Sequence, residues 1–155
     1  MKVLFVVPEV RLDGKPNHIP FWAGILAAIV EQKGGQVAIL DLNALRTKYG
    51  GKFVPSKIIE EEISSEKWDI IGIGGLSSMY SDIKKVIQIS RKLNPHALIV
   101  CGGGFITYMP DKIMKFNPDI DIACIGEGED TWKDILRTYG KGDWKNVKGI
   151  CYRDG

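Results

Sequence analysis

The sequence lacks the features that mark a nucleic-acid partner, a membrane protein or a disulfide-bonded protein. Its 21 Lys and Arg residues are nearly balanced by 19 Asp and Glu residues, and no basic block offers a surface for a polyanion. The longest apolar run, residues 19–30, is too short to cross a bilayer. The three cysteines, at positions 101, 124 and 151, form no close pair and fit neither a disulfide framework nor a metal site. We expect a cytoplasmic protein with reduced cysteines and no nucleic-acid or membrane partner.

Common nucleotide and phosphoryl motifs are also missing. No GxxxxGK[ST] loop is present, and the segment GEGEDT at 126–131 lacks the third glycine of a dinucleotide fingerprint and carries three carboxylates that would repel a pyrophosphate. The segment after the first predicted strand, residues 8–10, lacks the hydroxyls and glycines that a flavin phosphate needs. A phospho-receiver domain needs an acceptor aspartate where this chain has Gly74 and Gly75. These absences disfavour NAD and exclude nucleoside triphosphates, FMN and a phospho-receiver domain.

Glycine is in excess, with 18 of 155 residues, about 12% against roughly 7% in average proteins. Short β-branched runs alternate with helix-like stretches, with no repeat or linker. This pattern predicts a single α/β domain over residues 1–155, a doubly wound, mostly parallel sheet of five or six strands in a Rossmann-like or flavodoxin-like arrangement. The predicted strands are residues 2–7, 36–40, 69–73, 97–101, 121–125 and 148–152.

Five helical regions are predicted. Residues 21–33 are apolar almost all round, which predicts a buried helix, whereas 79–93 carry one apolar stripe typical of a half-exposed helix. Residues 58–63 predict a weaker helix beside a solvated carboxylate run. Pro110 and Glu129 each stand where a further helix should begin, because proline and carboxylates favour the first turn.

Three glycine clusters follow neighbouring predicted strands: residues 72–75, 102–104 and 126–128. One interpretation is turn chemistry, because glycine supplies the positive φ needed where strands turn into helices. The other follows from their shared position at the carboxyl ends of parallel strands, where ligands bind in such sheets. Three clusters at one edge favour a backbone surface against which a large, flat ligand lies.

The motifs resemble the cobalamin-binding domain found ahead of the catalytic barrel in cobalamin-dependent radical S-adenosylmethionine enzymes. Residues 102–111, GGGFITYMPD, follow that family's GGxHxTxxPE segment, with Phe105 where histidine is common and Asp111 in place of glutamate. Residues 126–129 match its GEGE element, residues 20–28 are similar to its first helix, and 39–41 to its second strand. Residues 149–155 resemble the stretch that leads into the catalytic domain.

The resemblance implies that cobalamin is the cofactor and that no residue of this chain is catalytic or ligates a metal. A corrin ring would lie on the strand ends, and its nucleotide tail would thread between the sheet and a helix layer, with Ser77, Ser78 and Thr107 supplying hydroxyl partners. We expect Gly103 to border that tail, so that a valine there abolishes binding and leaves the fold intact. The expected cofactor-binding residues are Pro8, Gly74, Gly75, Leu76, Ser77, Ser78, Gly102, Gly103, Gly104, Phe105, Thr107, Gly126, Glu127 and Gly128.

The chain departs from the better-known cobalamin domains at the first of their three motifs, DxHxxG, which supplies a histidine ligand to cobalt. Asp13 and His18 are five positions apart instead of two, and His96 precedes a strand. We therefore expect cobalamin to bind without its own base and without a histidine on the lower face of the cobalt. The loop after the first strand would present Val10, Leu12 or backbone to that face.

No CxxxCxxC motif is present, so an iron–sulfur cluster and S-adenosylmethionine would belong to a barrel following residue 155, with this chain a fragment of a longer methyltransferase-like enzyme. Two alternatives stay open. One is a degenerate domain of the same fold that binds no cobalamin and acts as an interaction or capping module. The other is a free-standing flavodoxin-like enzyme with Glu127, Glu129 or Asp130 as general base, although carboxylates in a first turn more readily cap a helix.

Overall fold

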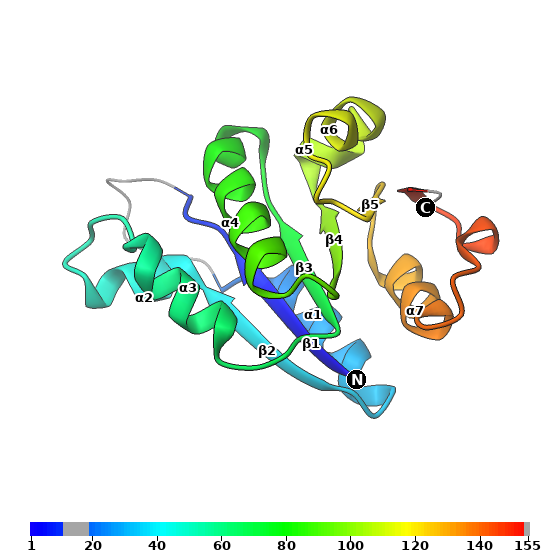
Figure 1. Cartoon of the computed structure of the whole chain (residues 1–155), viewed down its shortest axis with the longest axis horizontal. Coiled ribbons are helices and arrows are strands. Elements are labelled where there is room, and N and C mark those ends of the chain that lie inside the picture. The colour runs from blue at the N-terminus through cyan, green and yellow to red at the C-terminus, as the bar shows by residue number, and fades with distance from the viewer. Residues whose placement is uncertain (11–18, 154–155) are drawn as a thin grey trace.

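A computed structural model describes residues 1–10 and 19–153 and contains one six-stranded sheet (Figure 1). The strand order is β2-β1-β3-β4-β5-β6, in which the first five strands are parallel and β6 is antiparallel to β5. The predicted doubly wound, mostly parallel sheet is therefore confirmed. The strands are β1 (Lys2–Val7), β2 (Gln36–Asp41), β3 (Ile70–Gly74), β4 (Leu98–Gly102), β5 (Ile122–Cys124) and β6 (Ile150–Tyr152).

Helices cover both faces of the sheet, as β-branched strands buried on both sides require. In Figure 1, α4 crosses in front of the sheet and α1 lies behind it. The helices are α1 (Phe21–Gln32), α2 (Leu42–Lys48), α3 (Ser56–Ser64), α4 (Tyr80–Leu93), α5 (Gly104–Thr107), α6 (Pro110–Phe116) and α7 (Glu129–Thr138), with short 3₁₀ turns at Ser77–Met79 and Trp144–Asn146. The helices expected to begin at Pro110 and Glu129 do so, whereas α2 and α5 were not predicted.

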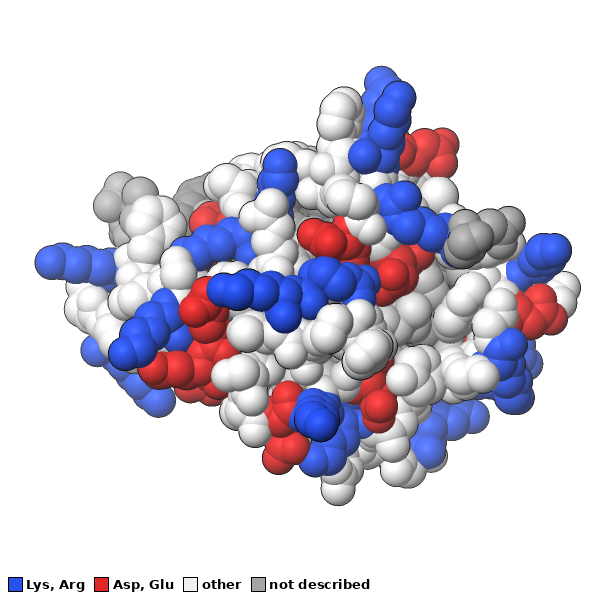
Figure 2. Space-filling view, viewed as in Figure 1, with Lys and Arg blue, Asp and Glu red and all other residues white. Residues whose placement is uncertain are grey.

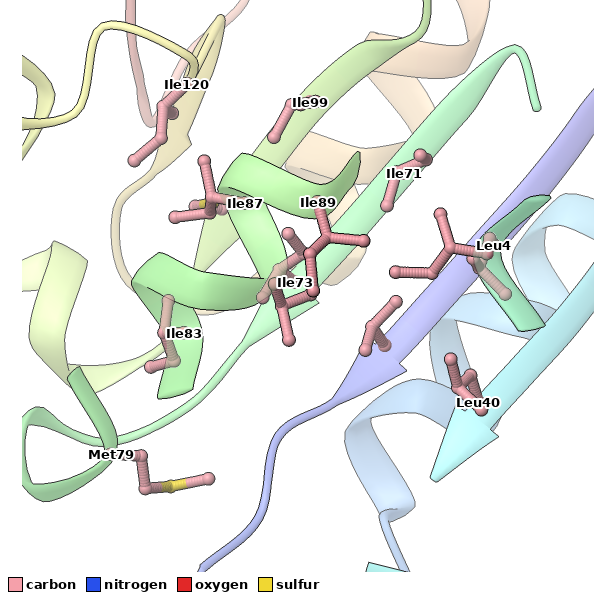
Figure 3. Close-up of a cluster of buried hydrophobic side chains, with 14 of the residues drawn as sticks. Leu4, Leu40, Ile71, Ile73, Met79, Ile83, Ile87, Ile89, Ile99 and Ile120 are labelled. Carbon is pink, nitrogen blue, oxygen red and sulfur yellow. The ribbon is translucent and has the colours of Figure 1, made fainter. Parts of the chain in front are cut away.

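The core has two layers because side chains alternate along each strand. On one face, Ile71, Ile73 and Ile99 pack against Ile83 and Ile87 of α4 (Figure 3). On the other face, the alternate strand residues pack against α1 and α7. Since the strands run in parallel, the turns after β3, β4 and β5 all lie at the same edge of the sheet.

The expectation that residues 21–33 form a buried helix is wrong. Residues 21–32 do form a helix, but only one face of it is buried: Ala23, Ala27, Ile29 and Val30 lie in the core, while Phe21 is 72% exposed and Ile25 is 47% exposed. Ala23 and Ala27 allow the first turns of α1 to lie close to the sheet, and Phe21 and Ile25 point outward. Apolar side chains therefore lie on two faces of α1, and only one of these faces packs in the core.

Basic and acidic side chains intermingle on the surface shown in Figure 2, in keeping with the balanced composition. None of the helices in residues 1–10 and 19–153 is both long and apolar enough for a membrane span.

Candidate functional site

The three glycine clusters meet at one edge of the sheet, as predicted. Gly74 and Gly102 are register partners at the ends of β3 and β4, and the Gly75 amide donates a hydrogen bond to the Gly102 carbonyl (3.3 Å). The turn after β5 joins them through Thr107, whose hydroxyl oxygen accepts a hydrogen bond from the Gly126 amide (3.1 Å). The strand ends of β3, β4 and β5 thus form one connected backbone surface.

Thr107 has a structural role in that surface. Its hydroxyl donates to the Gly103 carbonyl (3.2 Å) while accepting from Gly126. A threonine hydroxyl has a single proton to donate. The hydroxyl of Thr107 thus links the turns after β4 and β5, and a ligand could meet it only through the remaining lone pair.

Contacts within the protein itself require a glycine at position 103. Its φ is +94°, and a Cβ placed there would lie 2.5 Å from the Gly75 carbonyl oxygen and 2.9 Å from the Gly75 nitrogen. Backbone atoms cannot move aside as a flexible side chain can, and the conformation is strained for any other residue. The expectation that valine at position 103 would leave the fold intact is wrong, because Gly103 sets the close approach of the two turns.

The glycines of the β3 cluster face protein side chains. A Cβ at Gly74 would lie 3.0 Å from ring atoms of Trp22, and one at Gly75 would lie 2.8 Å from Cδ1 of Ile83. At these positions the space that a side chain would occupy is already filled by α1 and α4.

Four other glycines face open space or loose contacts. A Cβ at Gly126 would meet nothing within 4 Å, and one at Gly128 would come no nearer than 3.9 Å to Leu26. At Gly102 and Gly104 the nearest atoms are at 3.5 and 3.6 Å, which is ordinary van der Waals contact. The turns after β4 and β5 therefore carry the open part of the surface, and we call these four residues the open glycines.

Exposed side chains surround the open glycines. Leu76, Ser77 and Ser78 are exposed at the turn after β3, and Tyr108, which follows α5, is 85% exposed. Glu127 is exposed between two of the open glycines. The side chains around the open glycines thus combine apolar area with hydroxyl groups. This combination suits a large ligand with a flat apolar body and a few polar arms.

Phe105 lies in the core. It is 2% exposed, and its ring centroid is 6.4 Å from that of Tyr80. A phenyl ring has no polar atom to satisfy, so it can be buried where a histidine would need a partner. In this position the Phe105 ring packs in the core beneath the turn after β4 and offers almost no exposed area to a cofactor.

Asn43, which the sequence analysis missed, holds the end of β1. Its side-chain amide donates to the Pro8 carbonyl (2.9 Å) and its oxygen accepts from the Val10 amide (2.8 Å). Asp41 caps α2 through the amides of Asn43 and Ala44. Because Asp is a preferred helix cap, an α2 beginning after residue 41 could have been predicted. The long-range bonds of Asn43 left no sequence signal.

Two buried residues, Pro8 and Glu9, also hold the segment that follows β1. Pro8 is buried, and the 4% exposed Glu9 accepts a hydrogen bond at Oε1 from the Val54 amide (3.0 Å). Burial raises the pKa of the Glu9 carboxyl, because the charged form loses hydration. Val10 is exposed, whereas Leu12, Asp13 and His18 lie outside the described residues.

Two of the carboxylates after β5 lie where the helix dipole favours negative charge. Glu129 and Asp130 occupy the first turn of α7, and Asp130 forms an ion pair with Lys133 (2.7 Å). The hydrogen bond from Lys133 lowers the pKa of Asp130. A carboxylate with a lowered pKa is a weaker base, so this geometry does not favour a general base at Asp130.

Two surface hollows lie away from the carboxyl ends of the strands. One is lined by residues of the β2 edge together with Trp68, and the other by residues at the amino ends of the central strands, including Arg91 and His96. Neither includes a glycine of the three clusters. The position of His96 opposite to the glycine edge agrees with the prediction for it.

Comparison with known families gives one match over most of the chain. The family model described as the B12 binding domain matches residues 10–136. Among curated proteins, the chain is 33% identical over 160 residues to an uncharacterized methyltransferase of Pyrococcus horikoshii, covering 99% of the chain and 33% of that protein. It is 27% identical over 159 residues to the anaerobic magnesium-protoporphyrin IX monomethyl ester cyclase of Rubrivivax gelatinosus, covering 98% of the chain and 28% of the cyclase.

A solved structure shares the fold. The radical S-adenosylmethionine methyltransferase TsrM from Kitasatospora setae, with cobalamin and a 4Fe-4S cluster bound, superposes with a TM-score of 0.78 at 20% identity, covering 97% of this chain and 27% of TsrM. The chain thus spans between about a quarter and a third of the length of these relatives.

Proposed function

The chain belongs to the B12-binding domain family, and from this membership we propose that its strand-end surface holds cobalamin for a reaction completed by another part of a longer protein. The observation that carries the proposal is the surface of open glycines, Gly102, Gly104, Gly126 and Gly128, at the edge where ligands bind in doubly wound sheets.

The chemistry of this surface suits a corrin ring. The ring is a broad, mostly apolar plate with amide arms, and backbone without side chains allows it a close approach. Leu76 and Tyr108 supply exposed apolar area beside the glycines. Ser77 and Ser78 supply exposed hydroxyls for the amide arms. Of the expected binding residues, those with open or exposed positions are retained in the proposal: Leu76, Ser77, Ser78, Gly102, Gly104, Gly126, Glu127 and Gly128.

The proposal includes no protein ligand to cobalt. Asn43 fixes the backbone of Pro8 and Val10, so the segment leaving β1 starts in a defined place, and Val10 is exposed there. His96 lies at the opposite edge of the sheet. Cobalamin would then be held without its own base and without histidine, with Val10 or the backbone beside it facing the lower side of the cobalt.

We infer that residues 1–155 form one domain of a longer cytoplasmic protein, and that a radical S-adenosylmethionine barrel follows. The relatives are three to four times longer, and apolar residues that stay exposed near the strand ends, such as Phe21, Leu76 and Tyr108, suit a covering partner. The cysteines are free, as a reducing compartment requires. Cobalamin supplies a cobalt centre that can carry a methyl group, so the proposed activity is methyl transfer or related radical chemistry. A CxxxCxxC motif in the gene beyond residue 155 tests this part.

Titration with hydroxocobalamin tests binding directly. We expect a change in the visible spectrum and retention of the cofactor through a desalting column at micromolar protein. At Gly104 and Gly128 an added Cβ would meet no atom closer than 3.6 Å, and φ is not positive, so Gly104→Leu and Gly128→Leu should each abolish retention while preserving the circular dichroism spectrum. Gln88→Leu, on the exposed face of α4, adds an apolar side chain away from the site and should bind normally.

One observation favours the degenerate domain as a second candidate. Aromatic side chains fill the space beside Gly72 and Gly74, where a nucleotide tail would thread between the sheet and α1. A domain that binds no cobalamin would leave the hydroxocobalamin spectrum unchanged and would retain no cofactor.

A further inference from the structure

An aromatic cluster fills the layer between β3 and the helices α1 and α7. Phe5 of β1 packs edge-on against Trp22 of α1, with ring centroids 6.0 Å apart and planes at 89°. It also packs against Trp132 of α7, with centroids 5.0 Å apart. The aromatic rings lie directly against two glycines of β3. A Cβ at Gly72 would lie 2.6 Å from the Phe5 ring, and one at Gly74 would lie 3.0 Å from the Trp22 ring.

One polar atom in the cluster has no partner among the described residues. Trp132 is 2% exposed, and its indole Nε1 has no hydrogen-bond acceptor in residues 1–10 and 19–153. Buried N–H groups in proteins are almost always paired. An unpaired donor therefore marks this layer as a place where a further group bearing an acceptor would be stabilised.

Trp22 is the most accessible member of the cluster. Phe5 and Trp132 are buried, whereas Trp22 is half-buried. It lies in the first turn of α1, which begins after Pro20 with no side-chain cap hydrogen bond and no acidic residue in that turn. A helix start without these contacts frays more readily than a capped one.

On the basis of the proposed function, we propose that the Trp22 indole blocks the path of the nucleotide tail of cobalamin and must move aside for the tail to bind. We call this side chain the plug. Its indole lies over Gly74, in the layer between the sheet and α1, and it is a planar bicyclic group of about the same size as the base that ends the tail. The tail can lie against Gly74 only when the indole leaves. Trp22 then sets the affinity for cobalamin that carries a tail, and it has no effect on a corrin without one.

Cobinamide, the corrin without the nucleotide tail, separates the two parts of the site. The dissociation constants of cobalamin and cobinamide are measured by visible titration for the unaltered chain and for Trp22→Ala. Removing the plug removes the cost of displacing it, so cobalamin should bind roughly fivefold or more tightly, while cobinamide affinity should change by less than about twofold. Trp144→Ala, in the 3₁₀ turn beside the amino ends of the strands and thus opposite the proposed site, is the matched control and should change neither.

The other possible results contradict either the plug or the proposed function. An equal change for both corrins, or no change for either, overturns the plug and leaves the proposed function intact. Weaker binding of cobalamin alone also overturns it, because Trp22 would then be a stacking partner of the base. Binding of neither corrin by either protein contradicts the proposed function itself. Should Trp22→Ala fail to fold by circular dichroism, Trp22→Phe, which retains a smaller ring, replaces it and should shift cobalamin affinity in the same direction by less.

Discussion

Gly103 and Gly75 touch through their backbones: a Cβ on Gly103 would lie 2.5 Å from the Gly75 carbonyl oxygen. The turns after β3 and β4 pack so closely that one of them must lack a side chain. This contact aligns Gly102 and Gly104 with the turn after β3 and makes the strand-end surface continuous.

Gly103→Ala should therefore destabilise the protein by about 2 kcal/mol or more, since the methyl group meets backbone and the residue must keep a positive φ. Urea denaturation followed by circular dichroism measures the free energy of unfolding. Gly104→Ala, where the added Cβ makes an ordinary 3.6 Å contact with Leu76, should change it by no more than about 0.5 kcal/mol. Equal effects at both positions would contradict the backbone contact.

Asn43→Ala should lower the free energy of unfolding by about 1–3 kcal/mol, because the Pro8 carbonyl and the Val10 amide lose the partner that satisfies them. Asn146→Ala, which removes only an exposed contact with Asp143, is the control and should have little effect. If the two variants are equally stable, Asn43 does not hold the end of β1.

Glu9 makes stability depend on pH. Burial raises its pKa in the folded protein above the ordinary value of 4.5, so folding favours the protonated acid. Its contribution is most favourable below pH 4.5 and is lost as the pH rises through the folded pKa. Glu9→Gln should therefore be more stable relative to the unaltered protein at pH 7 than at pH 4, as measured by urea denaturation at both values. A difference between the two proteins that does not vary with pH would show that the Glu9 pKa is not raised.

The cysteines should react in a fixed order. Cys101 and Cys124 are buried, and burial raises the pKa of the Cys124 thiol to about 12, whereas Cys151 is partly exposed. Since the thiolate is the nucleophile, iodoacetamide at pH 8 should label Cys151 first and the other two only on unfolding. Mass spectrometry of digested protein identifies the site, and Cys151→Ser should remain unlabelled while folded. Early labelling of Cys124 would indicate an opening of the β5 region.

Much of the fold could be predicted because strand periodicity and parallel connection depend on local sequence. The convergence of residues 72–75, 102–104 and 126–128 at one edge followed from that topology. What each glycine faces did not, because Trp22, Ile83 and the Gly75 backbone come from other elements. The same reason explains why Phe105 was assigned to the ligand, why Asn43 was missed, and why α1 was expected to be buried although Phe21 and Ile25 face outward.

The coordination of cobalt tests the central claim most directly, because it reports binding and binding mode together. Electron paramagnetic resonance of cobalt(II) cobalamin shows each high-field line split into a triplet when a nitrogen occupies the lower face. We predict that saturating amounts of this protein convert the triplet of the free cofactor into unsplit lines, with neither the cofactor's base nor a histidine bound. A triplet that persists unchanged, in the protein and in His18→Ala alike, would contradict the account; one that disappears only in His18→Ala would identify His18 as the ligand and contradict it equally.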